Sequence, residues 1–159
     1  MYVLVREGGI RKEIEAVAKI KDMNLDLRQL ILTTDGIMPE QLLAAGYLEV
    51  VVQKAIDLGF EPISAIQMVT INAARHLNLD HIIGGIAPGK YADIVIIPDL
   101  YNIKAEYVIS NGRTVARDGE VTLPPRKHTF PEWTRRSMRL SKQFEPLCGL
   151  LMSRGISDT

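Results

Sequence analysis

The sequence predicts an α/β fold in which short parallel strands alternate with helices and are followed by a small layer of β-structure. Residues 2–5 and 30–34 are apolar runs rich in strand-forming residues, and a helical pattern follows each. The order strand, helix, strand, helix implies parallel strands joined by a right-handed crossover. After Leu79 the helical patterns give way to short apolar runs separated by Pro-Gly and Asn-Gly pairs, which favour β-structure.

The first strand is expected at residues 2–5 and ends where Arg6-Glu7-Gly8-Gly9 begins. Residues 10–22 predict a helix, because Ile10, Ile14 and Val17 share one face. Glu15 and Lys19 are spaced to form an ion pair on its solvent side.

The second strand is expected at residues 30–34. A helix follows over residues 39–58, with a possible bend at Gly46 and a C-cap at Gly59. Another helix begins at Glu61-Pro62 and continues to about Leu77.

The second half of the chain predicts strands. Residues 82–97 are expected to form two short strands about a Pro-Gly turn, and residues 107–116 a hairpin on a type I′ turn at Asn111-Gly112. Residues 129–132 fit a capping box that opens a final helix.

Composition excludes several classes of protein. The 159 residues contain 19 Lys and Arg against 19 Asp and Glu, and no apolar run approaches the length of about 20 residues that spans a bilayer. The single cysteine, Cys148, excludes an internal disulfide and a multi-cysteine zinc site. Charged residues also interrupt any N-terminal signal sequence. We therefore expect a cytoplasmic protein that binds neither nucleic acid nor membrane.

Asp35 is the first candidate for a functional residue. The strand at residues 30–34 stops at this aspartate, turns at Gly36 and leads into a helix at Pro39. A carboxylate at the C-terminal end of a parallel strand lies where barrel enzymes hold their catalytic groups. The alternative is an Asp-Gly turn in which the carboxylate only caps the amides that follow.

Other polar residues have structural alternatives. His76 and His81 are five residues apart across a helix end, so they do not form a ligand pair on one helix face, and His128 lies in a linker. Asn72 is expected to bond backbone groups near a helix end. Cys148 lies in an apolar stretch and is expected to be a packed thiol.

Three motifs occur in an order that resembles the C-terminal part of the metal-dependent amidohydrolase superfamily. They are residues 32–36 (LTTDG), 68–74 (MVTINAA) and 84–95 (GGIAPGKYADIV), of which the last is the most specific. Within the superfamily, residues 5–8 (VREG) and 34–36 (TDG) most resemble the adenine deaminases of bacteria and archaea. The resemblance extends from about residue 3 to about residue 119.

The resemblance implies the last part of a (β/α)8 TIM-type barrel, followed by part of a small β-sandwich and a C-terminal helix. A whole barrel takes about 250 residues, so this chain is too short to hold one. Residues 2–5 and 30–34 would be strands seven and eight. The expected division is residues 1–80 for the barrel portion, 81–123 for the sandwich portion and 124–159 for a linker and helix. The first six strands would then be missing, and Met1 would be an introduced start or a cut in a longer reading frame.

The resemblance also implies an activity, the hydrolysis of adenine to hypoxanthine and ammonia with a divalent metal, which would be manganese, iron or zinc. Asp35 would be a metal ligand and the catalytic proton acceptor. Arg6 and Glu7 would contact the purine substrate, with a salt bridge at the strand end as the alternative. Because one carboxylate does not make a metal site, we expect the chain alone to bind no metal and to be inactive.

Two alternatives remain open at this point. The chain could derive from another amidohydrolase, such as a dihydroorotase, an N-acetylglucosamine-6-phosphate deacetylase or an imidazolone hydrolase. It could also be a non-catalytic assembly subunit that kept the last strands and lost those that bind metal. In each case the unpaired edges of the barrel strands predict a homo-oligomer.

Overall fold

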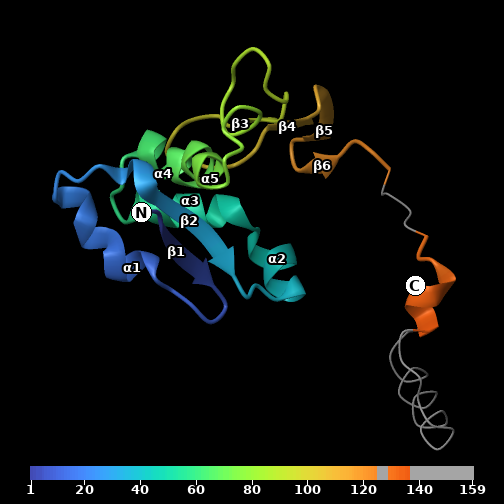
Figure 1. Ribbon diagram of the computed structural model, residues 1–159, viewed down its shortest axis with the longest axis horizontal. Coiled ribbons are helices and arrows are strands. Elements are labelled where there is room, and N and C mark those ends of the chain that lie inside the picture. Colours follow the sequence, from blue (N-terminus) through green and yellow to red (C-terminus); the bar gives the residue numbers. More distant parts are fainter. Residues whose placement is uncertain (125–128, 137–159) are drawn as a thin grey trace, which may run out of the picture. The chain divides into compact units, whose positions relative to one another are not determined.

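The computed structural model describes residues 1–124 and 129–136, and the chain divides into two units, Met1–Pro124 and Pro125–Thr159. The first unit contains a two-stranded parallel sheet with its helices and a four-stranded antiparallel sheet (Figure 1). In the second unit the described part is a short 3-10 helix, Glu132–Arg136. The remainder of the predicted final helix, including Cys148, lies outside the described residues.

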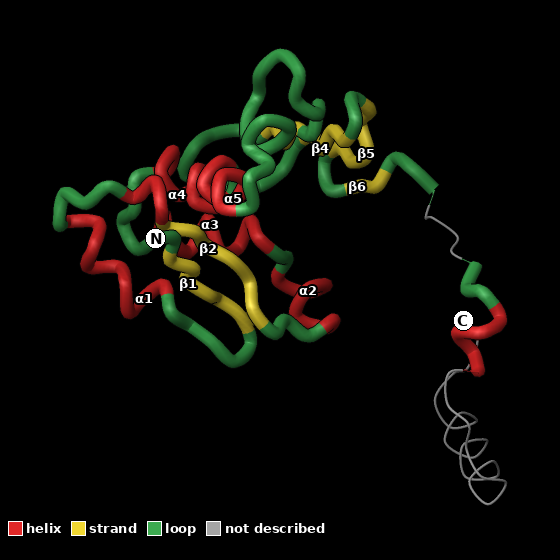
Figure 2. The backbone as a smooth tube through the Cα atoms, viewed as in Figure 1, coloured by secondary structure: helices red, strands yellow, loops and turns green. Residues whose placement is uncertain are grey.

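Strands β1 (Val3–Gly8) and β2 (Leu30–Asp35) form the parallel pair that the sequence predicts, each a little longer than expected. Arg6 lies opposite Thr33 and Gly8 opposite Asp35, so both strands end at the same edge of the sheet. A parallel pair needs a crossover connection. Here α1 (Ile14–Val17) and two 3-10 helices, Ala18–Asp22 and Leu27–Gln29, supply it (Figure 2).

The predicted helix over residues 10–22 is wrong in its first turn. Ile10 lies in a bend and is 86% exposed, whereas Ile14 is completely buried. Two backbone bonds explain the difference, because Gly8 N donates to Arg11 O and Glu13 N donates to Arg6 O. These bonds fold the residues after β1 into a tight loop, so the helix can begin only at Ile14.

The predicted helix over residues 39–58 is two helices. α2 (Pro39–Ala45) and α3 (Leu48–Asp57) are separated at Gly46, whose φ of 103° is accessible mainly to glycine. The bend expected at this glycine is therefore a complete break. Leu58 follows α3, and Gly59, with a φ of 93°, then turns the chain as predicted.

A second break divides the helix expected over residues 61–77. α4 (Pro62–Val69) begins at Glu61, whose carboxylate accepts hydrogen bonds from the backbone N–H groups of Ile63 and Ser64. α5 (Ile71–His76) starts after Thr70, whose φ of −120° and ψ of −91° are not helical. The Thr70 hydroxyl bonds the carbonyl of Ile66 and contributes to this kink.

The core lies between the parallel sheet and the helices that cover it. α3 and α4 pack against β2, and α1 packs against β1. The buried core consists of apolar side chains from both strands and from α1, α3, α4 and the turn after α3, namely Val5, Ile14, Leu30, Leu32, Val51, Val52, Ala55, Ile56, Phe60, Ala65 and Met68. Burial of this one face of the sheet fixes which side chains of β1 and β2 point to the opposite face.

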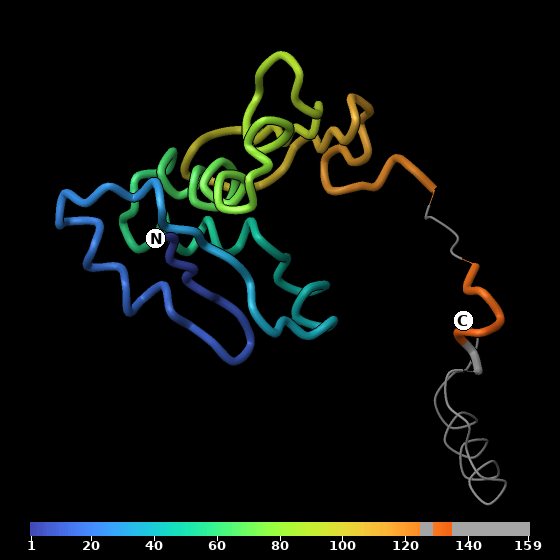
Figure 3. Tube along the Cα trace, in the orientation of Figure 1, coloured from blue at the N-terminus to red at the C-terminus, as the bar shows by residue number. Residues whose placement is uncertain are grey.

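The second sheet has the strand order β3-β4-β5-β6 and is antiparallel throughout. It consists of β3 (Ile94–Ile96), β4 (Tyr107–Ser110), β5 (Arg113–Arg117) and β6 (Glu120–Val121). The trace in Figure 3 runs from the first sheet through the helices to these strands.

The predicted hairpin is confirmed, because Asn111 and Gly112 connect β4 to β5 with φ angles of 49° and 74°. Asp93 explains part of the motif at residues 84–95. Its carboxylate accepts hydrogen bonds from the Ser110 hydroxyl at 3.0 Å and from Asn111 N at 2.8 Å, so it supports the hairpin turn.

Only one of the two strands expected over residues 82–97 forms. Residues 82–92 make an irregular loop that the bond from Tyr91 N to Ile82 O closes. Gly84 has a φ of 82°, and a Cβ at this position would overlap Ala74. The positive φ at Gly84 interrupts the extended backbone that a strand requires, and the same residue packs closely on α5.

Candidate functional site

The C-terminal ends of β1 and β2 bring together two of the residues that the sequence singles out. Successive side chains of a strand point to opposite faces. Arg6 pairs with Thr33 in the ladder, so Arg6 and Asp35 lie on the same face, two residues apart along the sheet. Val5 and Leu32, which alternate with them, are buried on the other face under the helices.

Arg6 and Asp35 form an ion pair. Arg6 Nη1 lies 3.5 Å from Asp35 Oδ2, and the two side chains are 41% and 40% exposed. In the described part of the chain, Arg6 supplies the one hydrogen bond to the Asp35 carboxylate, and it contacts only Oδ2. Oδ1 therefore has no hydrogen-bond partner among the described residues, and the Asp35 side chain is partly exposed.

Glu13 holds the same arginine from the loop after β1. Its carboxylate accepts a hydrogen bond from Arg6 Nη2 at 2.8 Å and a longer one from Nε at 3.4 Å. Hydrogen bonding from the Arg6 side chain, followed by that from its backbone N–H, lowers the pKa of Glu13. The same side-chain hydrogen bond raises the pKa of Arg6. Sequence reasoning missed Glu13, because no periodic spacing connects a loop residue with a strand residue seven positions earlier.

Glu7 points to the opposite face of β1, towards the helices. Its carboxylate accepts a hydrogen bond from Lys54 Nζ at 2.8 Å, and its side chain is only 12% exposed. Lys54 also pairs with Glu15 at 2.8 Å, and hydrogen bonds to Glu15 and then Glu7 raise the pKa of the lysine. Glu15 thus pairs with Lys54 of α3 rather than with Lys19, which lies in the 3-10 helix Ala18–Asp22, and this corrects the predicted pairing.

The residue after Arg6 and Glu7 is a glycine, Gly8, because the backbones of β1 and β2 lie very close together at this point. A Cβ at Gly8 would overlap the carbonyl oxygen of Asp35. Gly36 has a φ of 61° and turns the chain directly after the aspartate. Both glycines therefore position the end of β2 relative to β1.

The remaining candidates have structural partners or lie outside the site. The ring of His76 contacts that of Tyr2, with the centroids 5.0 Å apart and the ring planes tilted by 49°. Asn72 is buried and donates hydrogen bonds to the carbonyls of Leu27 and Leu30, which agrees with the structural alternative for this residue. His128 and Cys148 are not among the described residues.

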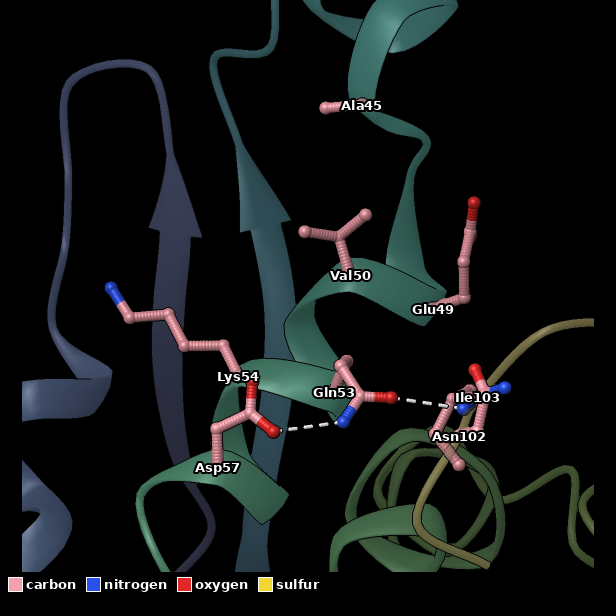
Figure 4. A pocket seen from close by; sticks show the side chains of 8 residues that line it. All are labelled: Ala45, Glu49, Val50, Gln53, Lys54, Asp57, Asn102 and Ile103. Carbon is pink, nitrogen blue, oxygen red and sulfur yellow. Dashed lines mark hydrogen bonds between the residues drawn. The ribbon is translucent and has the colours of Figure 1, made fainter. Parts of the chain in front are cut away.

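A cavity of about 320 Å³ lies between α3 and the segment at residues 102–103 (Figure 4). Gln53 spans it, donating to Asp57 Oδ1 at 2.9 Å and accepting from Ile103 N at 2.9 Å. Lys54 points away from the cavity towards β1. None of the predicted site residues lines this cavity. The hydrogen bond from Ile103 N to Gln53 attaches the segment before β4 to α3.

Among the described residues, the site provides one suitable metal ligand but not a complete set. The free carboxylate oxygen of Asp35 is a hard ligand of the kind that divalent cations accept. Residues 1–124 and 129–136 contain no group of three or more His, Cys, Asp or Glu residues that could hold a metal ion. Asp35 can therefore supply one ligand, and a complete site would need further ligands from elsewhere.

Comparison with known proteins shows that the sequence is similar to curated adenine deaminases. The adenine deaminase of Desulforamulus reducens is 40% identical over 153 residues, which are 96% of this chain and 26% of that protein. Adenine deaminase 1 of Carboxydothermus hydrogenoformans is 41% identical over 140 residues, 87% of this chain and 23% of that protein. The chain thus spans about a quarter of the length of the curated relatives that it matches.

A solved structure agrees at the level of the fold. The β-aspartyl dipeptidase of Fervidobacterium islandicum AW-1 aligns with 79% of this chain and with 36% of its own chain, with a TM-score of 0.59 and 18% sequence identity.

In the described part of the chain, no helix is both long and apolar enough to cross a membrane. The model of the amidohydrolase family, which is generally metal-dependent, matches residues 4–122. The chain therefore belongs to the amidohydrolase family.

Proposed function

We propose that this chain is part of a hydrolytic adenine deaminase, which converts adenine and water to hypoxanthine and ammonia. The identity of about 40% to adenine deaminases over nearly the whole chain supports this assignment. The reaction consumes a small purine, and the open face beside Asp35 is the part of the described chain best placed to meet one.

The proposal includes a place in the family fold. In it, β1 and β2 are the seventh and eighth strands of a barrel, residues 1–80 are the end of that barrel, and residues 81–123 belong to a small β-sandwich. The parallel pairing of β1 with β2 and the helices packed on one face support this assignment. The antiparallel strands β3 to β6 support the second part.

The position of Asp35 carries the proposal. Its carboxylate stands at the C-terminal end of a parallel strand, which is where barrel enzymes place their catalytic groups. Oδ1 is free to hold a metal ion or to accept a proton from the attacking water and pass it towards the departing ammonia. When bound, a divalent metal would lower the pKa of a coordinated water, to about 7 in the case of zinc.

The two predicted substrate-binding residues differ in their positions. Arg6 shares the face of Asp35 and is half exposed, so it lies within the proposed site. Glu7 lies on the helix side, and its carboxylate is engaged by Lys54. We therefore assign Arg6, and not Glu7, to the substrate side of the sheet.

An ammonia-release assay with adenine tests the proposal. It is run on the 159-residue chain and on the longest protein that its gene encodes, each with manganese, iron(II) or zinc added. We expect turnover by the longer protein, and none by the 159-residue chain, because Asp35 has no group of three or more metal-ligating residues around it within residues 1–124 and 129–136. Asp35→Asn should lower turnover by about 10²- to 10⁴-fold, the usual contribution of a general base.

Arg28→Gln is the matched control, because it changes an exposed ion pair with Asp26. It should leave turnover unchanged. Normal activity of the Asp35→Asn protein would return Asp35 to the role of a turn residue. Failure of the longer protein to release ammonia from adenine would refute the assigned substrate, and turnover by the 159-residue chain would refute the incomplete metal site.

A further inference from the structure

We infer that Glu13 and Arg6 act together as positioning residues that hold the Asp35 side chain in one χ1 rotamer, in which Arg6 contacts Oδ2 and leaves Oδ1 unbonded. The inference rests on the proposed function, because it concerns how Asp35 is prepared for its role there. It assigns a function to Glu13, a residue that the motifs do not include.

The first step is the grip of Glu13 on Arg6. Four hydrogen bonds join the two residues. The side chain of Glu13 accepts from Arg6 Nη2 at 2.8 Å, from Nε at 3.4 Å and from the backbone N at 3.0 Å, and Glu13 N donates to Arg6 O at 3.0 Å. Backbone and side-chain hydrogen bonds together therefore fix the Arg6 guanidinium relative to the Glu13 carboxylate.

The second step follows from the shape of the guanidinium group. It is planar, and its N–H groups have fixed directions. With Nε and Nη2 committed to Glu13, the remaining nitrogen, Nη1, lies 3.5 Å from Asp35 Oδ2. The ionic contact is long, so charge attraction rather than a short hydrogen bond orients the carboxylate. A lysine would lack the planar group that fixes these N–H directions, because its ammonium is a freely rotating point charge.

A contrast within the chain separates this network from an ordinary surface ion pair. Arg28 and Asp26 are two residues apart, and their side chains are 72% and 57% exposed. Arg6 instead connects β1 with the loop that follows it and with the end of β2, 29 residues away. It is therefore placed to control the position of a group on another element.

The first test measures the Asp35 side chain directly. Three-bond couplings from Asp35 Cγ to its backbone N and carbonyl carbon, measured by NMR on the 159-residue chain, report whether χ1 occupies one rotamer or several. We expect one rotamer in the parent chain. Arg6→Gln and Glu13→Gln should both give averaged couplings, whereas Arg28→Gln should not.

The outcomes of this test are decisive without any activity. Averaged couplings in the parent chain would overturn the inference, and so would a single rotamer that persists in Arg6→Gln. A thermal melt of each variant identifies loss of folding. If Arg6→Gln does not fold, Glu13→Gln supplies the comparison, because it keeps the arginine and the size of the side chain at position 13.

The second test uses the longer protein once it deaminates adenine. Arg6→Ala should lower kcat by about 10²-fold, as expected for a slightly misplaced catalytic group, with little change in KM. Added guanidinium ion should restore part of the activity, which loss of a purely structural residue would not allow. In an Asp35→Asn background, Arg6→Ala should have little further effect, because both changes remove the same action.

The two proposals fail in different ways. A longer protein without adenine deaminase activity contradicts the proposed function, while the NMR couplings still decide whether Glu13 and Arg6 position Asp35. A raised KM with unchanged kcat in Arg6→Ala would instead mean that the arginine binds substrate and does not position the aspartate.

Discussion

Replacement of Asn72 with aspartate should strongly destabilise the first unit. Asn72 lies on α5 and is 2% exposed. Its Nδ2 donates hydrogen bonds to the carbonyl of Leu27 at 3.0 Å and to that of Leu30 at 2.9 Å. The amide thus attaches α5 to the start of β2, more than forty residues earlier in the chain.

The magnitude follows from these contacts. Asn72→Asp keeps the size of the side chain but replaces the donor with an acceptor, so two hydrogen bonds worth about 0.5–1.5 kcal/mol each are lost. An uncompensated buried charge adds a cost of about 3–5 kcal/mol. We therefore expect the free energy of unfolding to fall by about 4–8 kcal/mol at pH 7. For a unit of this size, each kcal/mol lowers Tm by about 3–6 °C.

The assay is thermal and urea unfolding followed by circular dichroism, with Asn102→Asp as the matched control. Asn102 is exposed, so the same chemical change there should alter stability by less than about 0.5 kcal/mol. Burial raises the pKa of the introduced carboxyl above its unfolded value of about 3.9. The folded state then binds more protons than the unfolded state, so the deficit of Asn72→Asp should grow as the pH rises from 4 to 7. Equal stability of Asn72→Asp and Asn102→Asp at pH 7 would refute the role of the amide.

Three further predictions concern a titration, a packing contact and an assembly. Hydrogen bonds from the side chain and then the backbone of Arg28 lower the pKa of Asp26 to about 2. Its carboxyl should therefore titrate near pH 2 by NMR, and at a higher pH in Arg28→Gln. An unchanged midpoint would show that Arg28 does not lower the pKa of Asp26. Gly8→Ala should cost about 1–3 kcal/mol in urea unfolding because a Cβ would overlap the neighbouring strand, whereas Gly85→Ala, with no comparably close neighbour, should cost less. Because β1 and β2 form a sheet of only two strands, and the loop at residues 11–13 bonds the outer edge of β1 at Arg6 and Gly8, we expect self-association through the edge of β2 in light scattering. A monomer at tens of micromolar would argue against it.

Local patterns in the sequence determined much of this molecule. The apolar run that ends at Asp35, the turn at Gly36 and the hairpin at Asn111-Gly112 all lie where the sequence predicts them. Each depends on residues a few positions apart, since backbone preferences and strand periodicity act over that range. The motif at residues 84–95 indicated the family by its resemblance to known members and not by periodicity, and most of it forms a loop rather than the expected strands.

Only the tertiary structure decided which polar groups meet. The parallel register of β1 and β2 places Arg6 beside Asp35, and the loop after β1 brings Glu13 onto the same arginine. Glu15 pairs with Lys54 of α3 instead of Lys19, although Lys19 has the helical spacing. The physical reason is common to all three cases: charged side chains select partners by distance in space, and the burial of one sheet face under the helices sets those distances between residues far apart in the chain.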